Sequence, residues 1–138
     1  MTQVFFDTNI VLDVAFSRKP YFEASQKMLV LIEQKKISGH ISAITIPTIY
    51  YLLQKEIGHA KAKEYIHNLL KLFKVVEANK EVFDRALNIV TKDFEDAVQI
   101  ASAQLCKASF IITRNAKDFS GSSIAIISPS EYLADHQK

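Results

Sequence analysis

Short runs of consecutive apolar residues alternate along the chain with longer segments in which apolar residues recur every three or four positions. The short runs lie at residues 4–6, around Ile41, and at residues 75–76, 110–112 and 124–127. Uninterrupted apolar runs of this length are typical of strands that are buried on both faces of a parallel sheet. The pattern therefore predicts a sheet of short, mostly parallel strands.

The longer segments have the 3.6-residue period of amphipathic helices. They cover residues 21–35, 46–53, 59–73 and 82–90, and a further segment follows Asp93. Successive parallel strands are joined by crossover connections, usually helices, which then cover both faces of the sheet. We therefore predict the α/β class, as a three-layer α/β/α sandwich around a central, mostly parallel sheet.

Composition indicates the number of domains and the cellular compartment of this fold. The chain has 138 residues, 49% of them hydrophobic and 23% charged, which predicts one domain over residues 1–138. The lone Cys106 excludes an intramolecular disulfide and a cysteine-cluster metal site, and fits a reducing compartment. Without a basic, apolar leader or a run of about 20 apolar residues, we expect a cytoplasmic protein with no membrane partner. The net charge of +2 leaves the class of partner open.

Acidic residues stand where the predicted strands end. Asp7 leaves the first strand, and Asp118 follows the strand at residues 110–113. Asp93 and Asp96 open the helix that leads into that later strand. Ligands of parallel sheets bind beyond the carboxyl ends of the strands, so these carboxylates are expected at one edge. Neighbouring carboxylates repel unless they take up protons or hold a cation, and oxygen ligands favour Mg²⁺ or Mn²⁺.

Each of these acids also has a structural interpretation. In that interpretation Asp7 caps a turn and Asp118 is an ordinary turn residue, while Asp93 is a helix N-cap with Asp96 near the positive helix end. The functional interpretation rests on their combination with the polar neighbours Thr8-Asn9 and residues 113–115.

Four segments resemble motifs of PIN domains, in particular of the VapC-type toxins of bacterial toxin–antitoxin pairs. Residues 5–13, Phe-Phe-Asp-Thr-Asn-Ile-Val-Leu-Asp, resemble the opening motif, and residues 93–101 resemble the acidic helix start. Residues 111–119, Ile-Ile-Thr-Arg-Asn-Ala-Lys-Asp-Phe, are similar to the last motif. Residues 42–45 resemble the segment that leads into the second acidic position. The matches occur in the family's order and span essentially the whole chain, which implies a single PIN-like domain.

The resemblance implies a ribonuclease that depends on Mg²⁺ or Mn²⁺. Its catalytic and metal-binding residues would be Asp7, Asp96 and Asp118. The supporting residues would be Asn9, Thr48, Asp93, Thr113 and Asn115. Asp13 matches a recurrent acidic position of the opening motif and is compatible with a structural role. The implied partners are RNA, a cognate antitoxin and a second copy of the chain. Basic residues near the motifs are candidates for RNA contact, namely Arg18, Lys19, Arg114 and Lys117.

One position departs from the family pattern. Thr48 stands where VapC-type enzymes usually carry a glutamate, and it brings no negative charge. A catalytically degenerate PIN-like domain that binds RNA or a protein is therefore the alternative function. A phosphotransfer enzyme with Asp7 as nucleophile is disfavoured, because it needs a second aspartate where this chain has Asn9.

Overall fold

Five parallel strands form one sheet in the computed structural model, which describes residues 1–136. The strands are β1 (Thr2–Phe6), β2 (Ile37–Ser42), β3 (Lys74–Val76), β4 (Phe110–Ile112) and β5 (Ala125–Ile127). Their order in the sheet is β3-β2-β1-β4-β5, and every neighbouring pair is parallel. The strands predicted from the apolar runs are thereby confirmed, with β2 longer than the region around Ile41.

The first strand lies at the centre of the sheet, between β2 and β4. Val4 is paired with Gly39 on one side and with Phe110 on the other. The chain builds the sheet outward from β1 to β3, and then returns to the other side of β1 to add β4 and β5. This reversal makes the carboxyl ends of β1 and β4 a topological switch point, where open α/β sheets bind their ligands. Asp7 is the first residue after β1.

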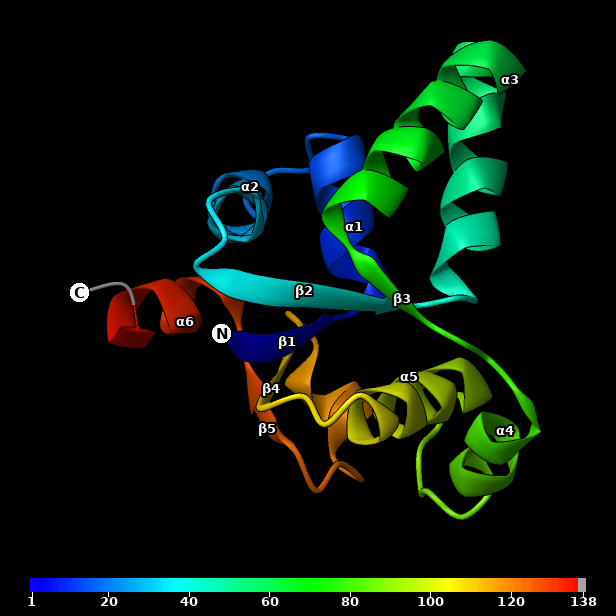
Figure 1. Ribbon diagram of the computed structural model, residues 1–138, viewed down its shortest axis with the longest axis vertical. Helices are drawn as coiled ribbons and strands as arrows, with labels where there is room; N and C mark the ends of the chain where they lie inside the picture. Colours follow the sequence, from blue (N-terminus) through cyan, green and yellow to red (C-terminus); the bar gives the residue numbers. More distant parts are fainter. Residues whose placement is uncertain (137–138) are drawn as a thin grey trace.

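Helices cover both faces of the sheet (Figure 1). One layer contains α1 (Thr8–Ala15), α2 (Phe22–Glu33) and α3 (Thr45–Leu72), and α6 (Pro129–His136) packs against α2. The other layer contains α5 (Phe94–Leu105), with α4 (Lys80–Ala86) packed on it. The three-layer sandwich predicted from the sequence is confirmed.

The alternation of side chains along β1 divides the core between these layers. Val4 and Phe6 are fully buried among α1, α2 and α3, in the cluster that includes Met28. Phe5 points to the opposite face and packs in a cluster with Ile100 of α5. The strand that carries the candidate site is therefore buried on both of its faces, as its unbroken apolar run predicts.

Helix α3 is two helical arms rather than one rod. The backbone breaks at Gly58, whose φ of 82° lies in the left-handed region that favours glycine. Figure 1 shows the two arms running side by side away from the sheet. Tyr50 on the first arm bonds through its hydroxyl to Nδ1 of His59 on the second arm, at 2.7 Å. The sequence predicted these arms as separate helices, 46–53 and 59–73.

Three helical features differ from the sequence prediction. The short helices α1 and α6 were not predicted, and α4 ends at Ala86 although the apolar period continued to Val90. Leu87 and Val90, which follow the end of this helix, are exposed. Within residues 1–136, no helix has both the length and the apolar character that a membrane span requires.

Candidate active site at the carboxyl edge of the sheet

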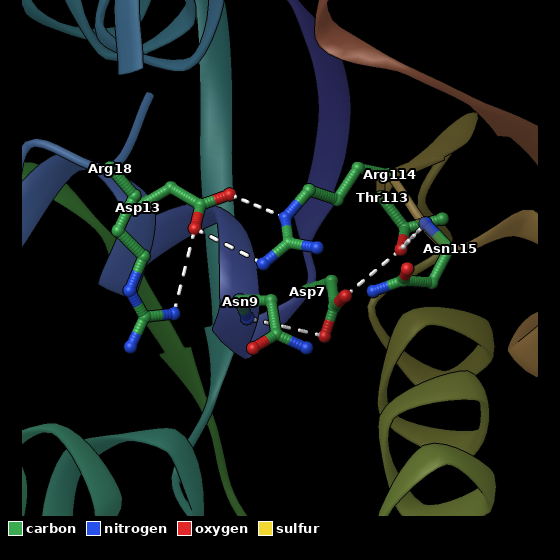
Figure 2. A network of polar contacts seen from close by, with 7 residues as sticks. All are labelled: Asp7, Asn9, Asp13, Arg18, Thr113, Arg114 and Asn115. Atoms are coloured by element: carbon green, nitrogen blue, oxygen red, sulfur yellow. Dashed lines mark hydrogen bonds and ion pairs between the residues drawn. The ribbon is translucent and has the colours of Figure 1, made fainter. Parts of the chain in front are cut away.

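Asp7 is the buried centre of the candidate site. Its backbone N–H donates to the carbonyl of Ile112 at 3.0 Å, which extends the pairing of β1 with β4 by one residue. Its side chain is only 2% exposed and accepts three hydrogen bonds. The donors are Thr113 Oγ1 at 2.9 Å, Gln99 Nε2 at 3.2 Å and the backbone N–H of Asn9 at 3.4 Å (Figure 2). Asp7 therefore caps a helix, α1, rather than a turn, and also lies at the switch point of the sheet.

Burial raises the pKa of Asp7 above its ordinary value. The hydrogen bonds from Thr113 and Gln99 and the positive charge of Arg114 act in the opposite direction, but burial outweighs them. An ionised carboxylate here is thus well oriented and yet poorly compensated in charge. A cation bound beside such a group would stabilise its ionised form.

Gln99 is a site residue that sequence reasoning missed. It is 1% exposed, and its Oε1 accepts from the backbone N–H of Thr8 at 2.9 Å and from Thr8 Oγ1 at 3.2 Å. Since its Nε2 donates to Asp7, one amide group fixes both residues of the β1–α1 junction. The signal in the sequence was a polar residue inside an apolar helical stretch, one turn after Asp96.

The start of α5 brings three more carboxylates to the site. Asp93 is the N-cap, and its Oδ1 accepts from the backbone N–H of Glu95 at 3.0 Å, which confirms the capping interpretation. The pKa of Asp96 is raised from its usual 3.8 to about 7. Burial is the largest cause, followed by the negative charges of Asp7, Asp93, Asp118 and Glu95. The charge of Asp96 is therefore coupled to every acid that the sequence placed at this edge.

Asp118 lies in a short 3-10 helix, η1 (Ala116–Phe119), and is exposed. Within residues 1–136, no three side chains of Asp, Glu, His or Cys come close enough together to hold a metal ion by themselves. Magnesium in proteins is commonly held by one or two carboxylates together with water and substrate phosphates. The oxygen-rich donor set and the raised pKa of Asp96 fit an ion of that kind.

The polar residues after β4 complete the surroundings of Asp7. Thr113 Oγ1 donates to Asp7 and accepts from the backbone N–H of Asn115 at 3.1 Å. The side-chain amide of Asn115 points toward Asp7 from the α5 side, and Asn9 lies on the α1 side (Figure 2). The structure thus brings Asn9, Thr113 and Asn115 around the carboxylate with which the sequence associated them.

Thr48 lies one turn into α3, close to the same junction. Thr45, one turn earlier, shares a 2.8 Å hydrogen bond with Thr8 through their hydroxyl oxygens. The hydroxyl of Thr48 donates to the carbonyl of Ile44 at 3.2 Å, so its proton is used by the helix backbone. The side chain at this position therefore carries a hydroxyl that is bonded to its own helix, and it carries no charge.

Asp13 and two of the basic residues form an ion-pair network beside Asp7, in which Asp13 is buried and the arginines are partly exposed (Figure 2). Asp13 is fully buried and accepts from Arg114 Nε at 2.7 Å and from Arg114 Nη2 at 3.3 Å. Arg18 Nη1 lies 3.5 Å from the same carboxylate. This arrangement supports the structural role of Asp13. Lys19 and Lys117, the other two candidates for RNA contact, are exposed.

The raised pKa of Asp96 gives the stability of the metal-free protein a pH dependence. Above pH 3.8 the folded protein keeps a proton that the unfolded chain loses, so stability falls as the pH rises to about 7. Because Asp96 is partly exposed, we expect a loss of about 1–2 kcal/mol rather than the full linkage value. Urea unfolding in EDTA between pH 4 and pH 8, compared for wild type and Asp96→Asn, measures it. Identical pH profiles of stability for the two proteins would show that Asp96 is not the source of the pH dependence.

Residues 3–117 match the family model of the PIN domain. The chain is 26% identical over 137 residues to Ribonuclease VapC1 of Aquifex aeolicus (strain VF5), covering 94% of this chain and 92% of that protein. A toxin–antitoxin complex from Klebsiella pneumoniae contains a chain with 25% identity and a TM-score of 0.67, covering 91% of this chain and 97% of that one. VapBC2 from Rickettsia felis, bound to a DNA fragment from its promoter, gives 13% identity and a TM-score of 0.69, with coverages of 92% and 98%.

Proposed function

The chain belongs to the PIN domain family, and from that membership we propose that it is a ribonuclease that needs Mg²⁺ or Mn²⁺ and hydrolyses RNA phosphodiester bonds. The observation that carries the proposal is the buried carboxylate of Asp7 at the switch point of the sheet, electrostatically coupled to Asp96. The relative named Ribonuclease VapC1 supports the same reaction class.

The residues proposed to hold the metal are Asp7, Asp96 and Asp118. A divalent ion bound there would polarise the phosphodiester and make a water molecule more acidic. Thr113 and Gln99 orient the carboxylate of Asp7 through their hydrogen bonds. Asn9 and Asn115 flank that carboxylate and are proposed to position water or an RNA oxygen. Protonation of Asp96, whose pKa is raised to about 7, would weaken the attraction of the site for a cation.

The proposed partners follow from the same relatives. Solved structures of similar fold are described as toxin–antitoxin complexes, which supports the role of a cytoplasmic toxin that is blocked by a cognate antitoxin. A homodimer is proposed as well. Neighbouring chains and the rim of the site are proposed to contribute to specificity.

Cleavage of RNA by the purified chain in Mn²⁺ is the direct test of the proposed function. We expect cleavage that stops with EDTA and is lost in Asp96→Asn, with intact RNA in both samples on a denaturing gel. An exposed carboxylate on the second arm of α3, Glu64, gives a matched control, and Glu64→Gln is expected to cut like wild type. If wild type does not cut in any divalent metal, the enzymatic proposal is wrong.

A catalytically degenerate RNA- or protein-binding domain is the second candidate, and Thr48 is the observation that favours it. A carboxylate is missing where the family usually has one, and the Thr48 hydroxyl is already bonded to the α3 backbone. Such a protein would bind RNA without cutting it, or would cut it slowly.

Introducing a carboxylate at position 48 tests whether its absence limits cleavage. We expect Thr48→Glu to raise metal-dependent cleavage by about 10- to 100-fold, because an added acidic ligand strengthens metal binding at the site. Thr48→Gln has the same size without the charge and should not raise the rate. Cleavage rates of the three proteins over a range of Mn²⁺ concentrations measure the effect. Equal rates for Thr48→Glu and Thr48→Gln would contradict a missing-ligand role for this position.

A further inference from the structure

A pocket of about 260 Å³ lies beside the candidate active site, between the start of α2, the segment after β4 and the start of α6. Its lining includes Tyr21, Ser25, Arg114, Ser128, Pro129 and Ser130. The volume is slightly below that of pockets for drug-sized ligands, and suits one compact group with a flat apolar face and a polar edge.

The Arg114 guanidinium and the Tyr21 ring form one wall of this pocket. The guanidinium carbon lies 4.1 Å from the centre of the Tyr21 ring, and the ring remains partly exposed. Asp13 fixes the guanidinium through two of its nitrogens, and the third nitrogen points away from Asp13 (Figure 2). The platform is therefore ordered before any ligand arrives, which lowers the entropic cost of binding.

Ser25 supplies an independent indication of a ligand. It lines the pocket and is fully buried. Within residues 1–136, its hydroxyl is the one buried side-chain polar atom that has no hydrogen-bond partner. Buried polar groups in native proteins are almost always paired, so an exception beside a pocket needs an explanation. A polar edge of a bound group would satisfy this hydroxyl.

The pocket also lies next to the segment that contacts Asp7. Arg114 directly follows Thr113, which donates to Asp7, and the charge of Arg114 acts on the Asp7 carboxylate. A group held against Tyr21 and Arg114 would therefore lie near the phosphodiester bond at the acidic edge.

We propose that this pocket binds one unpaired nucleotide of the RNA substrate, with its base on the Tyr21–Arg114 wall and its polar edge toward the serine hydroxyls. Unstacked RNA bases are recognised by stacking on aromatic rings and guanidinium planes together with hydrogen bonds to their edges. The pocket thus selects the base next to the bond that is cut. This inference rests on the proposed function, because it names how the same site chooses its RNA.

Binding of defined RNAs in EDTA tests the inference apart from cleavage. The probes are fluorescent RNA hairpins with one stem and a four-nucleotide loop, in which each loop position in turn carries each base or no base. We expect wild type to prefer one base at one position, and an abasic loop at that position to bind about 10- to 100-fold more weakly. Tyr21→Leu and Ser25→Ala should lose this preference.

Tyr51 provides a matched control, since Lys55 Nζ lies 4.1 Å from the centre of its ring and the ring is exposed. Tyr51→Leu should keep the base preference.

If Tyr21→Leu fails to fold, the binding of Ser25→Ala tests the inference instead, because removing an unpaired buried hydroxyl should leave the fold intact. Unchanged binding of every hairpin by the pocket variants would overturn the inference, and would point to a partner protein's side chain as the occupant. Base-selective binding without any cleavage would support base binding by the pocket and would overturn the nuclease proposal.

Discussion

Asp7→Asn is expected to lower RNA cleavage by about 100- to 1,000-fold while the folded protein becomes as stable as wild type or more stable. The substitution removes the negative charge from the best-oriented carboxylate of the site, and losses of this size are typical when one stabilising charge leaves an active site. Asparagine keeps the shape and still accepts hydrogen bonds from Gln99 and the Asn9 backbone. Because burial raises the pKa of Asp7, its ionised form destabilises the fold at neutral pH.

The opposite signs of the two effects are the diagnostic result. If Asp7 served mainly to stabilise the fold, its substitution would lower both the stability and the activity of the protein. If its charge serves the chemistry, the substitution lowers only the activity. Initial cleavage rates in Mn²⁺ and urea unfolding in EDTA, both at neutral pH, measure the pair. Glu64→Gln, on the exposed surface of α3, should change neither quantity. A marked loss of stability in Asp7→Asn together with retained cleavage would assign Asp7 to helix capping alone.

Asp13→Asn is expected to destabilise the fold by about 2–4 kcal/mol. Asp13 is fully buried and faces two guanidinium groups, so an uncharged amide leaves both of them without a counter-charge. Its –NH₂ group would also meet the N–H groups of Arg114, where the carboxylate accepted two hydrogen bonds. The estimate lies slightly below the full cost of breaking a buried pair, because the Arg114 and Arg18 side chains are partly exposed.

An exposed ion pair in the same chain gives the control for this prediction. Lys80 and Asp84 lie one helical turn apart in α4 with a 2.8 Å contact, and both are largely exposed. Asp84→Asn should change the free energy of unfolding by no more than about 0.5 kcal/mol. Urea unfolding at low and moderate salt separates the two sites, since salt screens the exposed pair much more than the buried one. A loss below 1 kcal/mol in Asp13→Asn would show that the network does not hold the fold together.

The parts of the site that the sequence predicted are those set by local pattern and topology. Asp7 was recognisable because an apolar strand stops there, and Asp96 because it opens an amphipathic helix. Parallel strands then bring such positions to one edge, whatever their separation along the chain. The helical period likewise predicted separate helices at residues 46–53 and 59–73, which are the two arms of α3 on either side of Gly58.

What sequence reasoning missed depends on partners far apart in the chain. Gln99 is 92 residues from Asp7, and Arg114 is 101 residues from Asp13, so no local spacing indicates either contact. Arg114 was predicted as a candidate for RNA contact, and two of its nitrogens donate hydrogen bonds to Asp13. Contact between Arg114 and RNA stays a prediction, and it would involve the guanidinium nitrogen that is not bonded to Asp13.

The central position of β1 affects when the acidic site can form during synthesis. A ribosome releases β1 and Asp7 first, but Asp7 is held by Gln99 and Thr113, which are synthesised about a hundred residues later. Until β4 has been made, β1 also lacks its neighbour on that side. The growing chain therefore carries its key carboxylate without the side chains that orient it. If the chain is a ribonuclease, the ribosome that makes it is exposed to no cutting activity until most of the chain has been completed.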